Sequence, residues 1–404
     1  MLESFLTGDV HGVRHDQERR NRNMTQKNMI GAYGKWAESL AGKDPRPLSF
    51  RNPNYHSLST WRRKARNKLF ELLAMPQHSW RINAKVHARY QYDGLSIEEL
   101  SWQLPYGPRT TAVFMKPAEA THSRLPAILA LHDHAGKKYF GFEKITKTSS
   151  KIHEMMVEHH NHYYEGTPWA NEIAKRGYAV LVHDAFAFGS RRVRYADVSD
   201  VLTAKRCEPR RDSRKEIEEY NQWARDHEHI MAKSLFCAGT TWPGVFLYED
   251  QCALDYLCSR NDVDASRIGC CGLSGGGLRT VMLAGLDSRI KAGVCVGFMS
   301  TWRDFMLYKC YTHTWMLYVP RLPLFLDFPE ILGLRVPLPA LVLNNTNDPL
   351  FTLSEMKRAD RILREVYRKA GAEANYCCSF YPGPHKFDRA MQKEAFEWFD
   401  KHLK

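Results

Sequence analysis

The chain has 404 residues, which allows two or three domains or one large α/β domain with insertions. Hydrophobic residues make up 44% and charged residues 25%, so the composition is globular and excludes a disordered or collagen-like chain. The net charge of +13 favours attraction to anions, but no nucleic-acid-binding module accompanies it, and we expect no nucleic-acid partner.

Three features bear on where the protein works. Residues 1–26 contain no apolar run typical of a signal peptide, and no stretch has the roughly 18 or more apolar residues of a membrane span. The ten cysteines lie between Cys207 and Cys378 without C-x-x-C spacing, which is typical of buried thiols in a reducing compartment. We therefore expect a cytoplasmic protein without a membrane partner.

The first predicted elements are helical. Apolar residues recur at steps of three and four over residues 26–75, with two X-Pro breaks. Over residues 82–116 the period changes to two, which predicts an antiparallel hairpin or meander. These patterns predict an N-terminal helical extension over residues 1–80 and a main domain over residues 81–404.

After residue 126 short apolar runs alternate with segments long enough for helices. The runs are typical of parallel strands buried on both faces and cover residues 127–131, 179–182, 268–271, 292–296, 341–343 and 377–380. The fold class predicted is α/β, a doubly wound, mostly parallel sheet with an antiparallel edge. Lid-like insertions at about 140–165 and 190–242 interrupt the alternation.

Both insertions carry residues that suggest function. A metal site would explain the histidines at 153, 159, 160 and 162, but no H-E-x-x-H pattern is present, so we favour a solvated lid helix and expect no metal. Arg191, Arg192 and Arg194 either attract an acidic substrate such as a uronate ester or are simply solvated. Several aromatic residues fit either a substrate pocket or the core, namely Trp242, Phe246, Trp302, Phe305, Trp315 and Tyr318.

A G-x-S-x-G motif spans Gly272 to Gly276 and is centred on Ser274. An apolar run precedes it and helix-compatible residues follow it, so we expect Ser274 on a sharp turn between a strand and a helix. Glycines let the backbone fold tightly there, and the helix start supplies backbone N–H groups and a positive dipole end. The alternative is a tight helix–sheet contact with an idle serine.

A serine hydroxyl becomes a good nucleophile only when a base takes its proton and a third group orients that base. With this motif the partners follow in the order Ser, Asp or Glu, His. Asp348 follows the predicted strand at 341–343, and His385 follows the one at 377–380. Since the carboxyl ends of parallel strands share one edge, we expect Ser274, Asp348 and His385 to act together as catalytic residues. Taken singly, a helix cap explains Asp348 and an exposed loop explains His385 equally well.

The loop after the run at 127–131 is a candidate for the oxyanion hole. At this position a backbone N–H can act with that of the residue after the nucleophile, and we assign these donors to His134 and Gly275. We expect His132 to support the loop through side-chain hydrogen bonds. Three further candidates fit the order or the strand ends less well: Asp327, Asp388 and His313.

These residues resemble the α/β-hydrolase superfamily and, within it, the dienelactone hydrolase and acetyl xylan esterase-like branch. The resemblance covers about Leu100 to Lys404 and is carried by the loop at 132–136, the segment at 253–269, the elbow at Ser274, the turn at 347–348 and the loop at 382–385. It implies hydrolysis of carboxylic esters or lactones without a cofactor. Dienelactone hydrolases use a cysteine nucleophile where this chain has Ser274, which puts their substrate in doubt.

The sequence thus predicts a serine esterase that cleaves a small-molecule carboxylic ester, such as an acetylated or uronate sugar ester, through an acyl-enzyme. An amide or peptide hydrolase with the same triad and a non-catalytic binding scaffold of the same fold are the alternatives. Neither the oligomeric state nor the natural substrate follows from the sequence.

Overall fold

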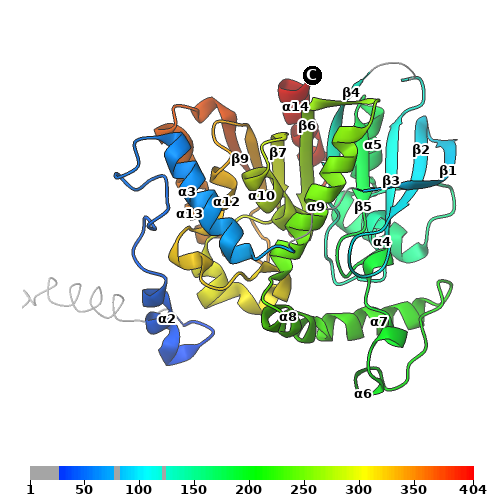
Figure 1. Ribbon diagram of the computed structural model, residues 1–404, viewed down its shortest axis with the longest axis horizontal. Helices are drawn as coiled ribbons and strands as arrows, with labels where there is room; N and C mark the ends of the chain where they lie inside the picture. Colours follow the sequence, from blue (N-terminus) through cyan, green and yellow to red (C-terminus); the bar gives the residue numbers. More distant parts are fainter. Residues whose placement is uncertain (1–26, 77–81, 121–123) are drawn as a thin grey trace, which may run out of the picture.

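The computed structural model describes residues 27–76, 82–120 and 124–404, so the prediction for residues 1–26 lies outside the described part. A nine-stranded sheet forms the middle layer, with helices on both faces (Figure 1). Its strands are β1 (Lys85–Tyr92), β2 (Leu95–Trp102), β3 (Thr110–Pro117), β4 (Leu125–Ala130), β5 (Ala179–His183), β6 (Val263–Leu273), β7 (Ile290–Val296), β8 (Ala340–Asn345) and β9 (Tyr376–Tyr381).

The helices connect these strands and extend the chain at both ends. They are α2 (Gly34–Leu40), α3 (Leu58–Leu73), α4 (Glu154–Tyr164), α5 (Trp169–Lys175), α6 (Asp200–Thr203), α7 (Arg214–Asp226), α8 (Glu228–Cys237), α9 (Trp242–Ser259), α10 (Gly275–Leu286), α11 (Trp302–Asp304), α12 (Phe328–Gly333), α13 (Leu353–Lys369) and α14 (Arg389–Leu403).

The strand order is β1-β2-β3-β5-β4-β6-β7-β8-β9. Neighbours from β1 to β5 in this order pair antiparallel, and those from β5 to β9 pair parallel. The predicted antiparallel edge followed by a mostly parallel sheet is therefore confirmed. Because β4 lies directly beside β6, the loop after β4 and the turn after β6 meet at one edge of the sheet.

Side chains on the two faces of the sheet enter two separate hydrophobic cores. Along β3, Ala112 and Phe114 join one core while Val113 and Met115 join the other, as the alternation of a strand requires. Helices α9 and α10, backed by α12 and α13, cover the first face, and α5 and α14 cover the second. The middle strands are buried on both faces, which explains their continuous apolar sequences.

The two N-terminal helices differ in how they contact the main domain. Helix α3 buries Trp61, Ala65, Leu69 and Leu73, which are four residues apart and so share one helical stripe, in the first core. Helix α2 leaves Trp36 largely exposed. The predicted helical pattern over 26–75 is confirmed by α2 and α3, and the division at residue 80 stays a prediction.

The first insertion forms α4, and its predicted solvation is wrong for the face that carries His159 and His160, whereas His162 is exposed. His159 and His160 on this helix are buried. Their Nε2 atoms have acceptors there, the Asp133 carboxylate and the Glu143 carbonyl oxygen, each at 3.0 Å. Helix α4 is therefore packed against the loop after β4.

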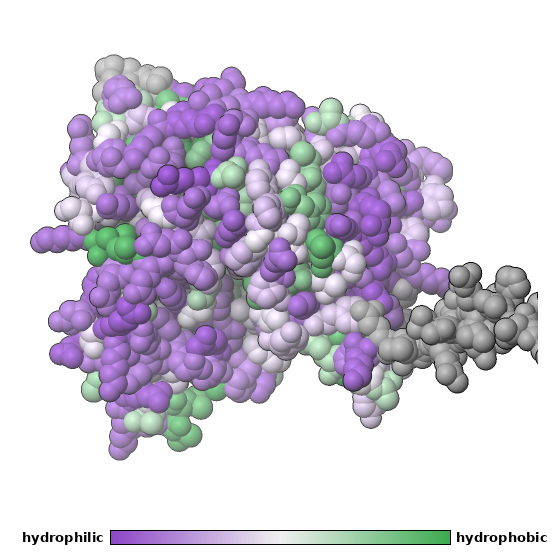
Figure 2. Space-filling model, turned by 180° about the vertical axis from the view of Figure 1, so that it is seen from behind, coloured by the Kyte–Doolittle hydropathy of each residue, from purple (hydrophilic) through white to green (hydrophobic). Residues whose placement is uncertain are grey.

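The second insertion forms α6, α7 and α8, and Figure 1 shows α7 and α8 along the lower edge of the molecule. The reverse face is mostly hydrophilic, and a green group at its lower left lies where Figure 1 places α6, whose Val201 is 90% exposed (Figure 2). Among the described helices, none combines the length and apolar character needed to cross a bilayer.

Candidate active site

Ser274 lies on the turn between β6 and α10, as predicted. Its backbone has φ 58° and ψ −118°, a combination that non-glycine residues rarely adopt. The Ser274 N–H donates to the Val296 carbonyl oxygen at 2.9 Å, which ties the turn to the end of β7. A Cβ on Gly276 would lie 2.1 Å from the Leu131 carbonyl oxygen, so only glycine fits this close approach to the β4 loop. The motif thus produces a strained nucleophile elbow.

Asp348 and His385 meet where β8 and β9 end. The two loops are joined by a hydrogen bond from the Asn347 N–H to the Gly383 carbonyl oxygen at 3.1 Å. His385 Nδ1 lies 2.6 Å from Asp348 Oδ2, and the other Asp348 oxygen accepts the Leu350 N–H at 2.9 Å. The second imidazole nitrogen, His385 Nε2, is buried and has no hydrogen-bond partner among the described residues. This is the arrangement of a base oriented by a carboxylate.

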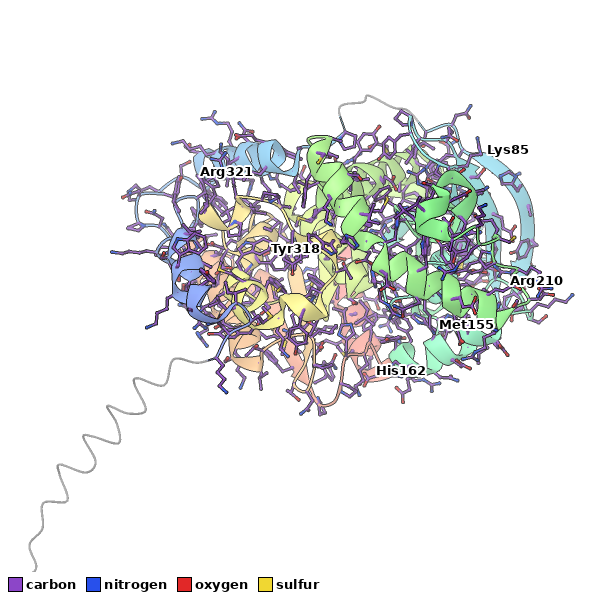
Figure 3. The ribbon with its side chains drawn as sticks, turned by 90° about the horizontal axis from the view of Figure 1, so that it is seen from below. Lys85, Met155, His162, Arg210, Tyr318 and Arg321 are labelled. Carbon is purple, nitrogen blue, oxygen red and sulfur yellow. The ribbon has the colours of Figure 1, made fainter. Side chains whose placement is uncertain are left out.

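Ser274 and His385 line one cavity of about 440 Å³, hereafter the Ser274 cavity. His134, Arg225 and Glu228 also line it, so one end of the cavity is polar. Figure 3 looks onto the lower edge of Figure 1, where α7 and α8 cross the face beside the segment that follows β7. The Ser274 cavity is thus enclosed by a strand edge, an insertion and a connecting segment.

Of the four described histidines that pair with a carboxylate, only His385 both lines the Ser274 cavity and keeps a ring nitrogen without a partner among the described residues. His134, His159, His183 and His385 each pair with a carboxylate, but only His134 and His385 line the Ser274 cavity. His134 uses both ring nitrogens, because Nδ1 accepts the Gly136 N–H at 2.9 Å and Nε2 donates to Glu228 at 2.6 Å. His385 is therefore the base that the geometry supports.

The β4 loop brings His134 against the start of α10. A Cβ on Gly275 would lie 3.1 Å from the His134 backbone nitrogen, so the two segments touch. As the first residue of α10, Gly275 has an N–H without an intrahelical acceptor. Within the described residues the His134 N–H also has no backbone acceptor. The two amides predicted to form the oxyanion hole are thus adjacent and unpaired.

A buried lysine holds the carbonyl groups of this loop. Lys144 is fully buried, and its ammonium donates to the carbonyl oxygens of Asp133 at 2.9 Å and His134 at 3.0 Å. The ammonium also lies 4.3 Å from the centre of the Phe188 ring. Burial lowers the pKa of Lys144 to about 7, and the nearby Asp133 carboxylate offsets this effect only in part. Burying the charged ammonium costs desolvation free energy. We infer that its hydrogen bonds offset this cost by holding the loop in place.

Glu228 reaches the same loop from the second insertion, at the start of α8. Its Oε1 accepts the His134 Nε2–H and lies 2.7 Å from the buried Lys138 ammonium. Burial alone would raise the pKa of Glu228, but His134 and Lys138 outweigh burial and lower the pKa to about 2. The carboxylate therefore stays charged and orients the His134 ring, whose Nε2–H points at Glu228 while Nδ1 accepts the Gly136 N–H.

The remaining predicted candidates have structural roles. His132 accepts the Ala185 N–H at 3.1 Å and supports the loop as predicted. Asp327 caps α12 and Asp388 caps α14, so neither carboxylate serves His385. Arg191 forms a buried ion pair with Glu249 and does not line the Ser274 cavity. The described residues contain no group of three or more His, Cys, Asp or Glu arranged to hold a metal ion.

The aromatic candidates divide between core and cavity. Trp242 and Phe246 are buried in a small core beside the second insertion, and Phe246 also lines the Ser274 cavity, as Trp315 does. Trp302, Phe305 and Tyr318 line an adjacent groove.

The chain is similar to proteins named as hydrolases and esterases. Residues 239–322 match the model of the prolyl oligopeptidase family, a segment that contains Ser274 and ends before Asp348. A Bacillus subtilis protein named "Putative hydrolase YtaP" is 27% identical over 345 residues, which cover 85% of this chain and 100% of that protein.

Two solved structures superpose on most of the chain. A "putative acetyl xylan esterase" from Bacteroides fragilis has a TM-score of 0.65 and 18% identity, covering 87% of this chain and 83% of that one. The chain has the α/β-hydrolase fold. A glucuronoyl esterase from Solibacter usitatus has a TM-score of 0.59 and 14% identity, covering 88% and 97% of the two chains. The α/β-hydrolase resemblance predicted from the sequence is thus confirmed.

Within this α/β-hydrolase fold, the sequence-based predictions missed the residues that support the β4 loop. Lys144 and Glu228 carry no local motif, and Glu228 reaches His134 from 94 residues further along the chain. Asp133 lies in the loop that the sequence analysis singled out, but its partners His159 and Tyr164 lie on a helix that was predicted to be solvated. Only a contact between distant segments identifies these residues.

Proposed function

We propose that this protein is a serine hydrolase that cleaves carboxylic esters through an acyl-enzyme on Ser274. One observation carries the proposal: a nucleophile elbow and a carboxylate-bound histidine with a free nitrogen line the same cavity. A binding scaffold does not need a strained serine beside a histidine held in this way.

In the proposed mechanism, His385 Nε2 accepts the Ser274 proton while Oγ attacks the ester carbonyl carbon. Asp348 keeps the proton on Nδ1 and stabilises the imidazolium that forms. The Gly275 and His134 N–H groups donate to the tetrahedral oxyanion, and each such donor is worth about 3–4 kcal/mol in related sites. The imidazolium then protonates the leaving alcohol, and water attacks the acyl-enzyme with His385 again as base.

For the substrate we propose a sugar ester, acetylated or of a uronic acid. Two features support this class: the polar end of the Ser274 cavity, with Arg225 and Glu228, and the names of the two structural neighbours. The arginines at 191 and 192 no longer support an acidic substrate, because they are engaged with Glu249 and Glu208.

The deciding experiment compares the wild type with Ser274→Ala on p-nitrophenyl esters and with a fluorophosphonate probe. We expect hydrolysis and labelling by the wild type only, with kcat on the order of 10⁶-fold lower in the variant and an unchanged thermal melt. Wild-type turnover by Ser274→Ala would refute the nucleophile. Absence of both hydrolysis and labelling in the wild type would favour the binding scaffold.

A second candidate, amide or peptide hydrolysis by the same residues, is favoured by the match to the prolyl oligopeptidase family. Matched p-nitrophenyl esters and p-nitroanilides separate the two candidates. We expect the ester to be preferred in kcat/KM, and faster turnover of the anilide would replace esters with amides as the substrate class.

A further inference from the structure

Beside the Ser274 cavity lies a second opening of about 610 Å³, here called the aromatic groove. The segment that follows β7 builds it from α11 and the short turns up to Pro323. Figure 3 shows Tyr318 of this segment near the middle of the face, close to the helices of the second insertion. The aromatic groove is lined by Trp302, Phe305, Met306, Cys310, Tyr318, Val319 and Pro323, together with residues of the Ser274 cavity.

The aromatic groove adjoins the Ser274 cavity. Tyr311, His313 and Trp315 line both, so a molecule with its reacting carbonyl at Ser274 can extend past these three rings. Tyr311 is 74% exposed and Trp315 is 40% exposed, although large apolar side chains at a surface are usually shielded. An exposed apolar surface next to a reactive centre is typical of a ligand site.

The chemistry of the lining selects an apolar ligand. None of the described Asp, Glu, Lys or Arg residues lines the aromatic groove. His313 uses its Nε2 to bind the Leu350 carbonyl oxygen at 3.0 Å, and burial lowers the pKa of His313 to about 4, so the ring is neutral. A sugar ring placed here would meet few hydrogen-bond partners, such as the unpartnered Trp302 Nε1–H, whereas an alkyl or aryl group needs none.

We propose that the aromatic groove binds an apolar arm of the ester, an alkyl chain or aryl ring, while the polar part of the substrate occupies the Arg225 end of the Ser274 cavity. This inference rests on the proposed ester hydrolysis and adds a substrate class to it: esters that join a polar group to an apolar one. The two openings share three lining residues, and this supports the substrate itself as the occupant of the aromatic groove.

The test measures the ratio of kcat/KM for p-nitrophenyl octanoate to that for the acetate. Tyr318→Ser removes an apolar wall, and Met306→Trp fills the groove. We expect each to lower the ratio on the order of tenfold, since a few buried methylenes account for such a factor. Trp36→Ala is the matched control, because Trp36 is 61% exposed on α2 and does not line the aromatic groove. Thermal melts establish that each variant is folded, and Met306→Trp keeps the test open if Tyr318→Ser does not fold.

A parallel series with octyl and ethyl acetate distinguishes the acyl arm from the alcohol arm, since the series whose ratio falls identifies the arm that the groove holds. An unchanged ratio in both series overturns the proposal. A changed oligomeric state on gel filtration with unchanged ratios also overturns it and assigns the surface to a second copy of the chain. If the wild type neither hydrolyses esters nor reacts with the fluorophosphonate, the proposed function itself has failed instead.

Discussion

The two sides of Ser274 are built in different ways. On one side, Asp348 and His385 lie on loops that directly follow neighbouring parallel strands, and a backbone hydrogen bond joins these loops. On the other side, the loop carrying His134 is held by buried charged groups from elsewhere, Lys144 and Glu228. The first side depends on the sheet, and the second depends on insertions folded over it.

This difference predicts where the site is sensitive. The ends of β8 and β9 are placed by six register pairs between the two strands, which single substitutions outside the core rarely move. Buried ion contacts carry a desolvation cost and stabilise only while both partners are present. Substitutions on the His385 side should therefore lower kcat without changing the free energy of unfolding. Substitutions on the His134 side should lower both.

The largest effect is expected for Asp348→Asn. An amide in place of the carboxylate 2.6 Å from His385 Nδ1 favours the wrong tautomer, so kcat should fall about 10⁴-fold with an unchanged melting temperature. Steady-state kinetics and calorimetry measure both quantities. Asp388→Asn is the matched control, because Asp388 caps α14 and does not line the Ser274 cavity. Equal losses in the two variants would contradict the assignment of Asp348.

Glu228→Gln should lower both activity and stability. It leaves the buried Lys138 ammonium without its carboxylate and loosens the His134 ring, which costs about 3 kcal/mol in the free energy of unfolding. A small displacement of the oxyanion donors should lower kcat by up to about 10²-fold with little change in KM. Glu219→Gln on the exposed side of α7 is the control. A loss of stability with full kcat would show that Glu228 supports only the fold.

Lys144→Met should have the smallest effect on kcat, about tenfold, because methionine keeps the packing against Phe188 and loses the two hydrogen bonds to the loop and the cation–π contact. The stability of the wild type, unlike that of Lys144→Met, should depend on the titration of Lys144. The native pKa of Lys144 is lowered to about 7 while the unfolded value stays near 10.5, so above pH 7 the unfolded state binds more protons.

The lysine therefore makes the wild type more stable as the pH rises above 7, by up to about 1.4 kcal/mol per pH unit. Lys144→Met lacks this gain, so the wild type should become more stable relative to the variant between pH 7 and pH 9. Urea denaturation at several pH values measures the difference. Parallel stability curves for the two proteins would show that Lys144 does not titrate in this range.

Most of the sheet and the residues of the His385 side could be predicted from the chain. Continuous apolar runs mark the buried strands, and Ser274, Asp348 and His385 each follow one of them. The solvation of α4 could not be predicted correctly, because His159 and His160 are polar residues that are buried only once Asp133 and Glu143 provide acceptors. Hydrogen bonds between distant segments leave no periodic pattern in the sequence.

Local sequence was sufficient for the elbow, since a G-x-S-x-G run between strand and helix restricts the backbone whatever surrounds it. Tertiary structure alone decided how the His134 loop is held and which aromatic rings reach the surface. Lys144 and Glu228 look like ordinary residues of a helix or loop when taken singly. Their roles arise because the folded chain removes water around them and leaves each with only the partners that packing supplies.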